Sequence, residues 1–298
     1  MSNFGIELNE QELAEIREWT SKVRREMGID EDVPAAKELR RFLEKKNIYL
    51  CEYPFSGSND THLDATITRF EGDDPMIFIG LNTSLYYDEQ IFALAHELYH
   101  YYTRTGKAYD QEMTPEYMRH ERKADRFAAE LLLPREALES RVYREFPEGT
   151  VDDASWNRLL RFIGALHAEW WITYRSTVNR LKEENYIRTD SVFQKLYEVD
   201  ARDERGEYIR LMNGLHRDTI ELLNRQTRQS NVSDGIVECI LENYEEERIS
   251  EDSFVGLLKL IGKKPEDLGY PAIAAEPDDA AGGITACPAD AVEAVRKV

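Results

Sequence analysis

The pentapeptide HELYH, at residues 96–100, constrains this chain more than any other feature of its sequence. It lies in the apolar run IFALAHELYHYY, where polar side chains are costly to bury without partners. Residues four apart on a helix share one face, so His96 and His100 can present two imidazoles to one metal ion. Glu97 lies one step round the helix, where it can contact water at the metal without binding the metal itself. The motif predicts a catalytic metal helix with Glu97 as the general base.

A chance match is the alternative interpretation of this pentapeptide. Short motifs produce false positives, and two core histidines can be satisfied by ordinary hydrogen bonds. A third ligand would distinguish the two interpretations. The extended zinc motif with a third histidine is absent, because Thr103 and Gly106 occupy its glycine and histidine positions. A carboxylate ligand is therefore needed.

The segment 115–133, which begins after Thr114 with the proline typical of a first helical turn, supplies such a carboxylate. Glu121 falls in the middle of its apolar stripe, which consists of Tyr117, Ala124, Phe127, Ala128 and Leu131. An ionised glutamate that faces a core needs a partner, and a metal held by two histidines is one. Asp125, one turn further on, can accept the N–H of a ligating histidine and fix its tautomer. The alternative is a rotated helix that leaves Glu121 on the surface.

Together, AHELYH (95–100) and ERKADRFAAELLLP (121–134) resemble the ImmA/IrrE family of zinc metallopeptidase-like proteins. That family has HExxH followed by a helix of the form E-x-x-A-[N/D]-x-F-A-x-x-L-L-x-P. The resemblance implies a zincin-like core in which the two motif histidines and Glu121 bind zinc and Glu97 is the general base.

The resemblance extends beyond these two motifs. ITYRSTVNRLKEENYI (172–187) is similar to the helical element that follows the family's core, so the resemblance covers residues 30–190. The tail beyond residue 190 is only loosely similar to the helical extensions of some members. One departure is Tyr99, where many members carry glycine.

The charge balance excludes some classes of function. The chain has 38 basic and 58 acidic residues, a formal net charge of −20. This disfavours a general nucleic-acid binder or a membrane-surface protein, because both need basic surfaces. Residues 156–187 form a candidate helix-turn-helix with a mildly positive local charge, but the overall charge disfavours DNA contact. The acidic run ENYEEER (242–248) is interpreted as a solvated helix face, with docking to a basic partner as the alternative.

The cysteines and the termini bear on the compartment. Cys51, Cys239 and Cys287 are far apart and odd in number, so no disulfide framework or zinc ribbon is predicted. The N-terminal sequence lacks the positive start and apolar region of a secretory signal. No apolar run approaches the length of a membrane span. We expect a reduced, cytoplasmic protein without a membrane segment.

Hydrophobic periodicity predicts an α+β fold, with a small mixed sheet and the metal helix first and an all-helical region after residue 150. The predicted strands are 48–55, 65–70 and 76–82, with a loop at 57–60 and a turn at 71–75. The predicted helices are 9–27, one from Pro34, the metal helix with Asp88 as N-cap, 115–133 ended by Pro134, helix pairs in 156–187 and 235–262, and long helices in 190–230.

This pattern predicts four parts along the chain. They are a zincin-like domain at 1–150, a helix-turn-helix-like element packed on it at 151–190, a helical C-terminal domain at 191–270 and a flexible tail at 271–298.

Further residues are candidates for binding substrate. Strand 76–82 immediately precedes the metal helix, and we hypothesise that it pairs with an extended peptide through its backbone. The residues concerned are Ile77, Phe78, Ile79 and Gly80. A tetrahedral intermediate needs a donor for its oxyanion, and Tyr174 and His167 are candidates that the sequence does not single out.

These observations predict a zinc endopeptidase in which Glu97 moves the proton from water to the leaving amine. Two histidines and a carboxylate also suit manganese or iron. The family resemblance implies a substrate or partner that is a DNA-binding regulator, such as a repressor, or an antitoxin. The alternatives are a metal-containing regulatory protein that binds a transcription factor without cleaving it, and a toxin or phage-defence effector. The sequence does not determine the oligomeric state.

Overall fold

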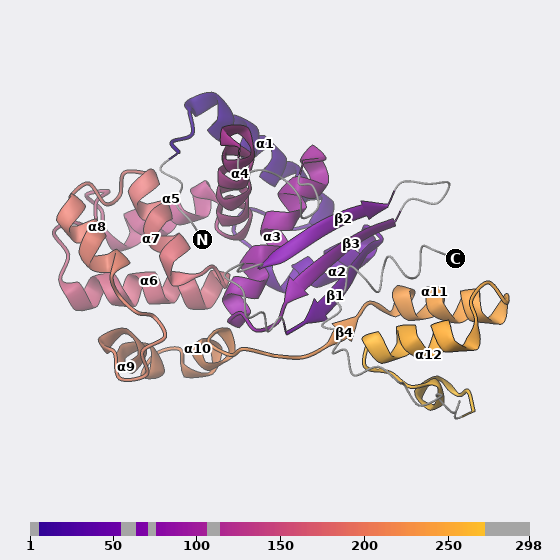
Figure 1. The fold of residues 1–298 in the computed structure, drawn as a ribbon. Helices are drawn as coiled ribbons and strands as arrows, with labels where there is room; N and C mark the ends of the chain where they lie inside the picture. The colour runs from indigo at the N-terminus through magenta and orange to yellow at the C-terminus, as the bar shows by residue number, and fades with distance from the viewer. Residues whose placement is uncertain (1–5, 55–63, 71–75, 106–113, 272–298) are drawn as a thin grey trace. The chain divides into compact units, whose positions relative to one another are not determined.

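The computed structural model describes residues 6–54, 64–70, 76–105 and 114–271 (Figure 1). It is an α+β structure with a small mixed sheet and many helices, which confirms the predicted fold class and is consistent with a zincin-like core. The predicted loop at 57–60, the predicted turn at 71–75 and all of the predicted tail except residue 271 lie outside the described residues.

Contacts divide the chain into two compact units. The helical unit comprises residues 1–42 and 85–227, and the sheet unit comprises residues 43–84 and 228–298. Each unit is therefore built from two separate stretches of chain. The predicted linear parts, with boundaries at 150, 190 and 270, stay a prediction.

The sheet unit has strand order β2-β3-β1-β4. The strands are β1 (Ile48–Tyr53), β2 (Ala65–Phe70), β3 (Met76–Asn82) and β4 (Asn231–Val232). β3 pairs in parallel with β1 and antiparallel with β2, and β4 pairs antiparallel with β1. The first three strands confirm the predictions. β4 was missed, and the expectation of an all-helical region after residue 150 is wrong there, because two residues are too short to show the alternation of a strand.

Two antiparallel helices complete the core of the sheet unit, as the sequence predicted. They are α11 (Asp234–Glu245) and α12 (Glu251–Leu260), and a short 3-10 turn, η2 (Pro265–Leu268), follows them. Ile236 and Ile240 of α11 and Phe254 of α12 pack in one buried cluster with Cys51 of β1 and Phe78 of β3. These helices therefore bury one face of the sheet with apolar side chains.

The helical unit has a short 3-10 turn, η1, and a series of α-helices (Figure 1). Their bounds are α1 Glu10–Met27, η1 Ala36–Glu38, α3 Tyr87–Thr103, α4 Pro115–Leu132, α5 Arg135–Glu145, α6 Trp156–Trp170, α7 Tyr174–Glu183, α8 Asp190–Tyr197, α9 Glu207–Asn213 and α10 Arg217–Leu223. The helix α2 (Leu39–Lys45) crosses the boundary between the units. α4 packs against both α1 and α3, and α10 contacts α3 and α6.

The end signals that the sequence predicted for α4 are confirmed. The Thr114 side chain accepts a hydrogen bond from the backbone N–H of Tyr117, and Pro115 occupies the first turn. The helix ends at Leu132, directly before the predicted last residue, Leu133, and Pro134.

The prediction of long helices within 190–230 is wrong. The structure has three short helices there, α8, α9 and α10. Gly206 and Gly214 flank α9 at its two ends, where glycine's conformational freedom weakens the helix. The charged composition of this region misled the prediction because helix-forming residues alone do not set helix length.

Buried ion pairs join α4 to α7, the second helix of the candidate helix-turn-helix. Arg180 is only 1% exposed and contacts Glu130 of α4 at 3.0 Å and Glu184 at 2.8 Å. Arg126 of α4 also pairs with Glu184, at 2.6 Å. Burial raises the pKa of Glu130 to about 6. Arg180 thus neutralises interior carboxylates, and its charge does not belong to a DNA-binding surface.

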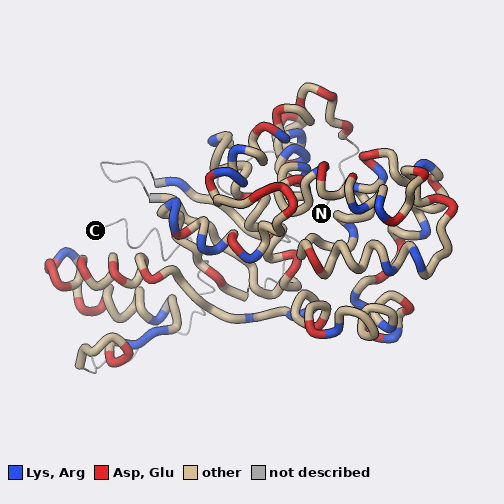
Figure 2. The backbone as a smooth tube through the Cα atoms, turned by 180° about the vertical axis from the view of Figure 1, so that it is seen from behind, with Lys and Arg blue, Asp and Glu red and all other residues tan. Residues whose placement is uncertain are grey.

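Charged residues are interleaved over much of the backbone, but α11 departs from this pattern (Figure 2). Residues 234–247 include six acidic residues and no basic one. α11 turns its apolar residues to the sheet, so this acidity agrees with the predicted solvated face. No helix in the described ranges combines the length and apolarity that a membrane span requires.

The packing of α6 against α9 gives a stability prediction. A Cβ at Gly164 of α6 would overlap the Met212 side chain of α9. We expect Gly164→Ala to lower the free energy of unfolding by about 1–3 kcal/mol, because overpacking forces side chains or backbone to move. The matched control is Gly256→Ala in α12, where nothing lies within 4 Å of the added Cβ. The free energy of unfolding of that variant should rise by about 0.5–1 kcal/mol, because alanine has a higher helix propensity than glycine. Urea unfolding measures both, and equal effects would contradict the α6–α9 packing.

Candidate metal centre

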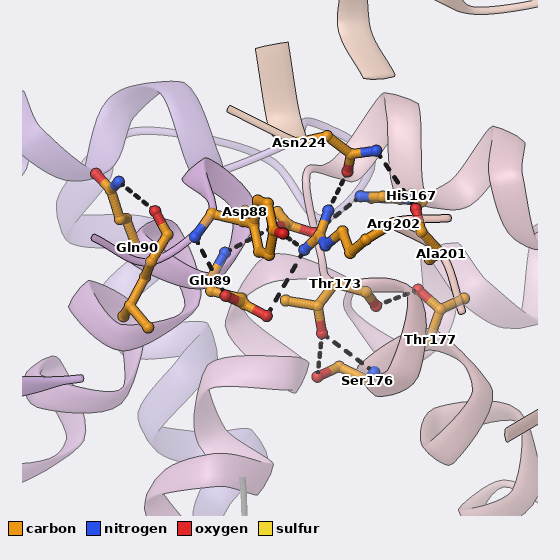
Figure 3. Close-up of polar contacts among 12 residues, drawn as sticks. Asp88, Glu89, Gln90, His167, Thr173, Ser176, Thr177, Ala201, Arg202 and Asn224 are labelled. Carbon is orange, nitrogen blue, oxygen red and sulfur yellow. Dashed lines mark hydrogen bonds and ion pairs between the residues drawn. The ribbon is translucent and has the colours of Figure 1, made fainter. Parts of the chain in front are cut away.

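The helix α3 carries the HELYH motif, and its start differs from the prediction. The N-cap is Tyr86, whose backbone N–H donates to the Glu89 carboxylate at 3.2 Å. Asp88 is therefore not the N-cap but lies in the first turn, fully buried. Its carboxylate contacts Nε2 of His167 at 3.0 Å and Nη2 of Arg202 at 2.5 Å (Figure 3). Asp88 thus fixes the beginning of α3 to α6 and to the segment before α9.

His167 forms the centre of this buried network. Its Nε2–H donates to Asp88, and Nδ1 lies 2.8 Å from the Tyr208 hydroxyl. Burial alone would raise the pKa of Asp88, but the hydrogen bond and charge of His167 and the charge of Arg202 lower it below the usual range. Asn224 accepts a hydrogen bond from Arg202 and so orients the guanidinium (Figure 3).

The two suggested oxyanion donors have other roles in the structure. Both ring nitrogens of His167 are engaged inside the buried network, and the side chain is fully buried. The Tyr174 hydroxyl donates to the backbone carbonyl of Leu196 at 3.0 Å, also in the interior. Neither group is available to a substrate, so the structure contradicts this role for both. The sequence could not show this, because their partners lie far away in the chain.

The three predicted ligands converge, as the sequence predicted. Nε2 of His96 lies 3.2 Å from Nε2 of His100 and 3.2 Å from Oε2 of Glu121. Nε2 of His100 lies 3.4 Å from Oε1 of Glu121. One ligand atom from each residue falls within 4.8 Å of the others. The four-residue spacing on α3 places the histidines, and the packing of α4 on α3 places the carboxylate.

In each histidine, the ring nitrogen that faces away from the three candidate ligand atoms is Nδ1, and it has a hydrogen-bond partner. Nδ1–H of His96 donates to Oδ1 of Asp125 at 3.0 Å, the role predicted for that residue. Nδ1 of His100 contacts the Thr105 hydroxyl at 3.0 Å. Thr105 was missed, since it lies beyond the end of α3 and no periodicity points to it.

Glu97 is buried beside the ligands, with 6% of its surface exposed. Burial alone would lower the pKa of His96, but Asp125, Glu121 and the charge of Glu97 raise it well above its usual value. Burial, Glu121 and Glu97 together raise the pKa of Tyr117 to about 12. The charge of Glu97 thus acts on both His96 and Tyr117.

The chemistry of the donor set fits a divalent metal. When both Nδ1–H groups donate outward, the groups that point inward are two nitrogen lone pairs and one carboxylate. Such a group repels itself unless a cation lies within it, either a proton or a metal. Two imidazoles and one carboxylate that leave a coordination position open suit catalytic zinc, and also manganese or iron.

Tyr99, the departure from the family pattern, has a packing role. It is buried between the two helices, with its ring 5.7 Å from that of Phe127 and edge-on to His100 at 5.6 Å. Burial raises its pKa above the usual range. The tyrosine therefore forms an apolar wall beside a ligand, where a glycine would leave space.

The hypothesis that residues 76–82 pair with a substrate is wrong for this sheet. β3, with Ile77, Phe78, Ile79 and Gly80, lies between β2 and β1, so strands already occupy both of its edges. Of the described strands, β2 and β4 lie at the edges. The sequence showed that 76–82 is a strand but did not reveal the strand order, which depends on non-local pairing.

The comparison with protein families agrees with this centre. Residues 43–182 match the family model described as the IrrE N-terminal-like domain, of peptidase family M78. No curated protein and no solved structure matches the chain. The matched range includes the three ligands, Glu97, Asp125 and Thr105.

Proton competition gives a pH prediction for metal binding. The raised pKa of His96 means that the metal-free centre holds a proton at neutral pH. Burial alone would raise the pKa of Glu121, but its contacts with His100 and His96 lower it and keep that carboxylate ionised. Zinc must displace the proton, so we expect affinity to rise about tenfold per pH unit until the pKa of His96 is passed. Competition with a coloured chelator measures this. Above that pKa the affinity should reach a plateau. Asp125→Asn removes a group that raises the pKa of His96, so the plateau should begin at a lower pH in this variant. A zinc affinity that does not depend on pH would contradict the prediction.

The buried network at the start of α3 gives a second prediction. We expect Asp88→Asn to lower the free energy of unfolding by about 3 kcal/mol, because it removes the charge that compensates Arg202. The pKa of Asp88 is lowered in the folded state, so this stabilisation is complete above the unfolded pKa of about 4. The stabilisation is lost as the pH falls through the lower pKa that Asp88 has in the folded protein.

Urea unfolding between about pH 3 and pH 7 measures this difference. The control is Asp190→Asn, whose carboxylate pairs with Lys182 in solvent and should change stability little. Equal losses in the two variants at neutral pH would contradict the role of Asp88.

Proposed function

We propose that this protein is a zinc-dependent endopeptidase, because residues 43–182 match the model of the IrrE N-terminal-like domain and bring His96, His100 and Glu121 together. The observation that carries the proposal is the convergence of these three ligands beside the buried carboxylate of Glu97. A structural zinc site uses four protein ligands, whereas three ligands with an open position are typical of catalysis.

In the proposed reaction, three residues bind the metal and a fourth, Glu97, transfers the proton. His96, His100 and Glu121 would hold the metal, which supplies the Lewis acidity that polarises a peptide carbonyl and acidifies water. Glu97 accepts a proton from the water as its oxygen bonds to the carbonyl carbon. Glu97 then gives this proton to the amide nitrogen as the carbon–nitrogen bond breaks. The outward hydrogen bonds of the two histidines hold their rings in place for this step.

The substrate that we propose is a regulatory protein, either a DNA-binding repressor or an antitoxin, cleaved at one or a few sites. This part of the proposal is supported by the resemblance to the ImmA/IrrE family and by the acidic α11, which suits a basic partner. Among the described strands, β2 and β4 lie at the edges of the sheet. An extended peptide that pairs with the sheet would therefore pair with one of these two strands.

We also propose a reduced, cytoplasmic setting for the protein. Cys51 and Cys239 do not form a disulfide, and Cys51 is buried in the core of the sheet unit.

The glutamate variant tests catalysis separately from metal binding. Zinc-loaded protein is incubated with a peptide mixture from a proteome digest, and new peptide ends are identified by mass spectrometry. We expect Glu97→Gln to bind zinc as the wild type does but to cleave about 10²–10⁴-fold more slowly, because the proton acceptor is lost. Glu116→Gln, at an exposed position in the first turn of α4, is the matched control and should retain activity.

The same variant decides between cleavage and binding. If Glu97→Gln keeps zinc and full biological activity, the protein acts without proteolysis, as a regulatory or effector protein that binds a partner. If the wild type holds zinc but cleaves no peptide and no candidate regulator, the endopeptidase proposal fails.

A further inference from the structure

A chain of hydroxyl groups follows the end of α3 and reaches His100. Thr103 is the last residue of α3, and Arg104 adopts a left-handed conformation with φ of 53°. This turn brings Thr105 back beneath the helix end. The Thr105 hydroxyl lies 3.0 Å from Nδ1 of His100 and 2.6 Å from the Thr103 hydroxyl. The Thr103 hydroxyl in turn lies 2.8 Å from the backbone carbonyl of Tyr99.

The direction of each hydrogen bond follows from the number of protons present. A carbonyl oxygen only accepts, so Thr103 donates its single hydroxyl proton to Tyr99. The short contact between the two threonines then requires the proton of Thr105. Because that proton is already used, the Thr105 oxygen accepts from His100. These contacts place a proton of His100 on Nδ1.

This assignment matters because the other ring nitrogen is the ligand atom. With the proton on Nδ1, Nε2 presents a lone pair toward His96 and Glu121. In the opposite tautomer, Nε2 would carry a proton and could not bind a metal. A lone threonine would not decide between the two, because a hydroxyl can donate as well as accept.

We propose that Thr103 and Thr105 are positioning residues that hold His100 in its Nδ1–H tautomer and so prepare Nε2 for the metal. The inference rests on the proposed metal centre. His96 obtains the same tautomer from a charged acceptor, Asp125, whereas His100 obtains it from two neutral hydroxyls fixed by a carbonyl. The two ligands are thus fixed by different chemistry, although they face the same point.

Nuclear magnetic resonance of the metal-free protein tests the tautomer directly. Long-range coupling between protons and nitrogen in protein labelled with ¹⁵N-histidine distinguishes Nδ1–H from Nε2–H, at a pH where the His100 ring is neutral. The wild type should show Nδ1–H at His100. Thr105→Val, which loses the hydroxyl but keeps the shape, should populate both tautomers. Thr105→Ser should restore the wild-type signal, and Thr103→Val should add the Nε2–H form, because Thr105 can then donate to the ring.

Zinc affinity of the same variants gives the second measurement. We expect Thr105→Val to weaken zinc about tenfold or more, as for other partners of metal-binding histidines, and Thr105→Ser to restore it. The matched control is Thr177→Val in α7. Its buried hydroxyl also donates to the carbonyl four residues earlier, that of Thr173 at 3.1 Å (Figure 3). The control should change neither the His100 signal nor the zinc affinity.

The outcomes separate this inference from the proposed function. If the wild-type His100 carries its proton on Nε2, or if Thr105→Val leaves both the tautomer and the zinc affinity unchanged, the inference is overturned. If the tautomer follows Thr105 but the wild type binds no zinc, the hydroxyl chain is supported and the metal centre fails. If zinc binds and peptides are cleaved regardless of Thr105, the endopeptidase stands without this device.

Discussion

The packing of α4 against α3 brings together groups that repel one another, and the surrounding structure depends on this constraint. Two imidazole nitrogens and a carboxylate lie within 4.8 Å in a partly buried place. Two nitrogen lone pairs and a carboxylate repel one another. They stay close only when a cation compensates them and when the packing of the protein prevents α3 and α4 from separating. The position of α4 is also fixed from the side of α1, because the buried guanidinium of Arg24 donates to the carbonyl of Leu131 at the end of α4 at 2.7 Å.

Both ends of α3 are held by polar groups of different kinds. At its start, buried Asp88 compensates Arg202 and accepts from His167 (Figure 3). At its end, Thr103 and Thr105 turn back onto a ligand histidine. The apolar contact between Tyr99 and Phe127 lies between these ends. A metal centre needs such support, because small displacements of the ligands change their geometry and their acidity.

The support for α3 does not come only from the residues that match the family model. The match ends at residue 182, yet Arg202 and Tyr208, which complete the network of Asp88, follow it in the chain. Asn224, which orients Arg202, lies later still. Residues 202–224, which follow the matched range, therefore help to anchor α3 and so have a structural connection to the candidate site.

The sequence by itself determined the local elements and the set of candidate ligands. Helical spacing placed His96 and His100 on one face, and the apolar stripe of α4 showed that Glu121 faces the interior, because both patterns repeat within one helix. The three long strands and the helix ends at Thr114 and Pro134 were likewise local signals.

Tertiary structure alone decided the rest, because those features join residues far apart in the chain. The central place of β3, the short β4 and the partners of His167 and Tyr174 depend on non-local pairing. Asp88 looked like an N-cap from its position, but its burial beside residues from α6 and the segment before α9 gives it another role. Thr105 lies only five residues from His100, yet the left-handed turn at Arg104 was needed to bring them into contact. Periodicity predicts which face a side chain occupies, whereas folding determines what that face meets.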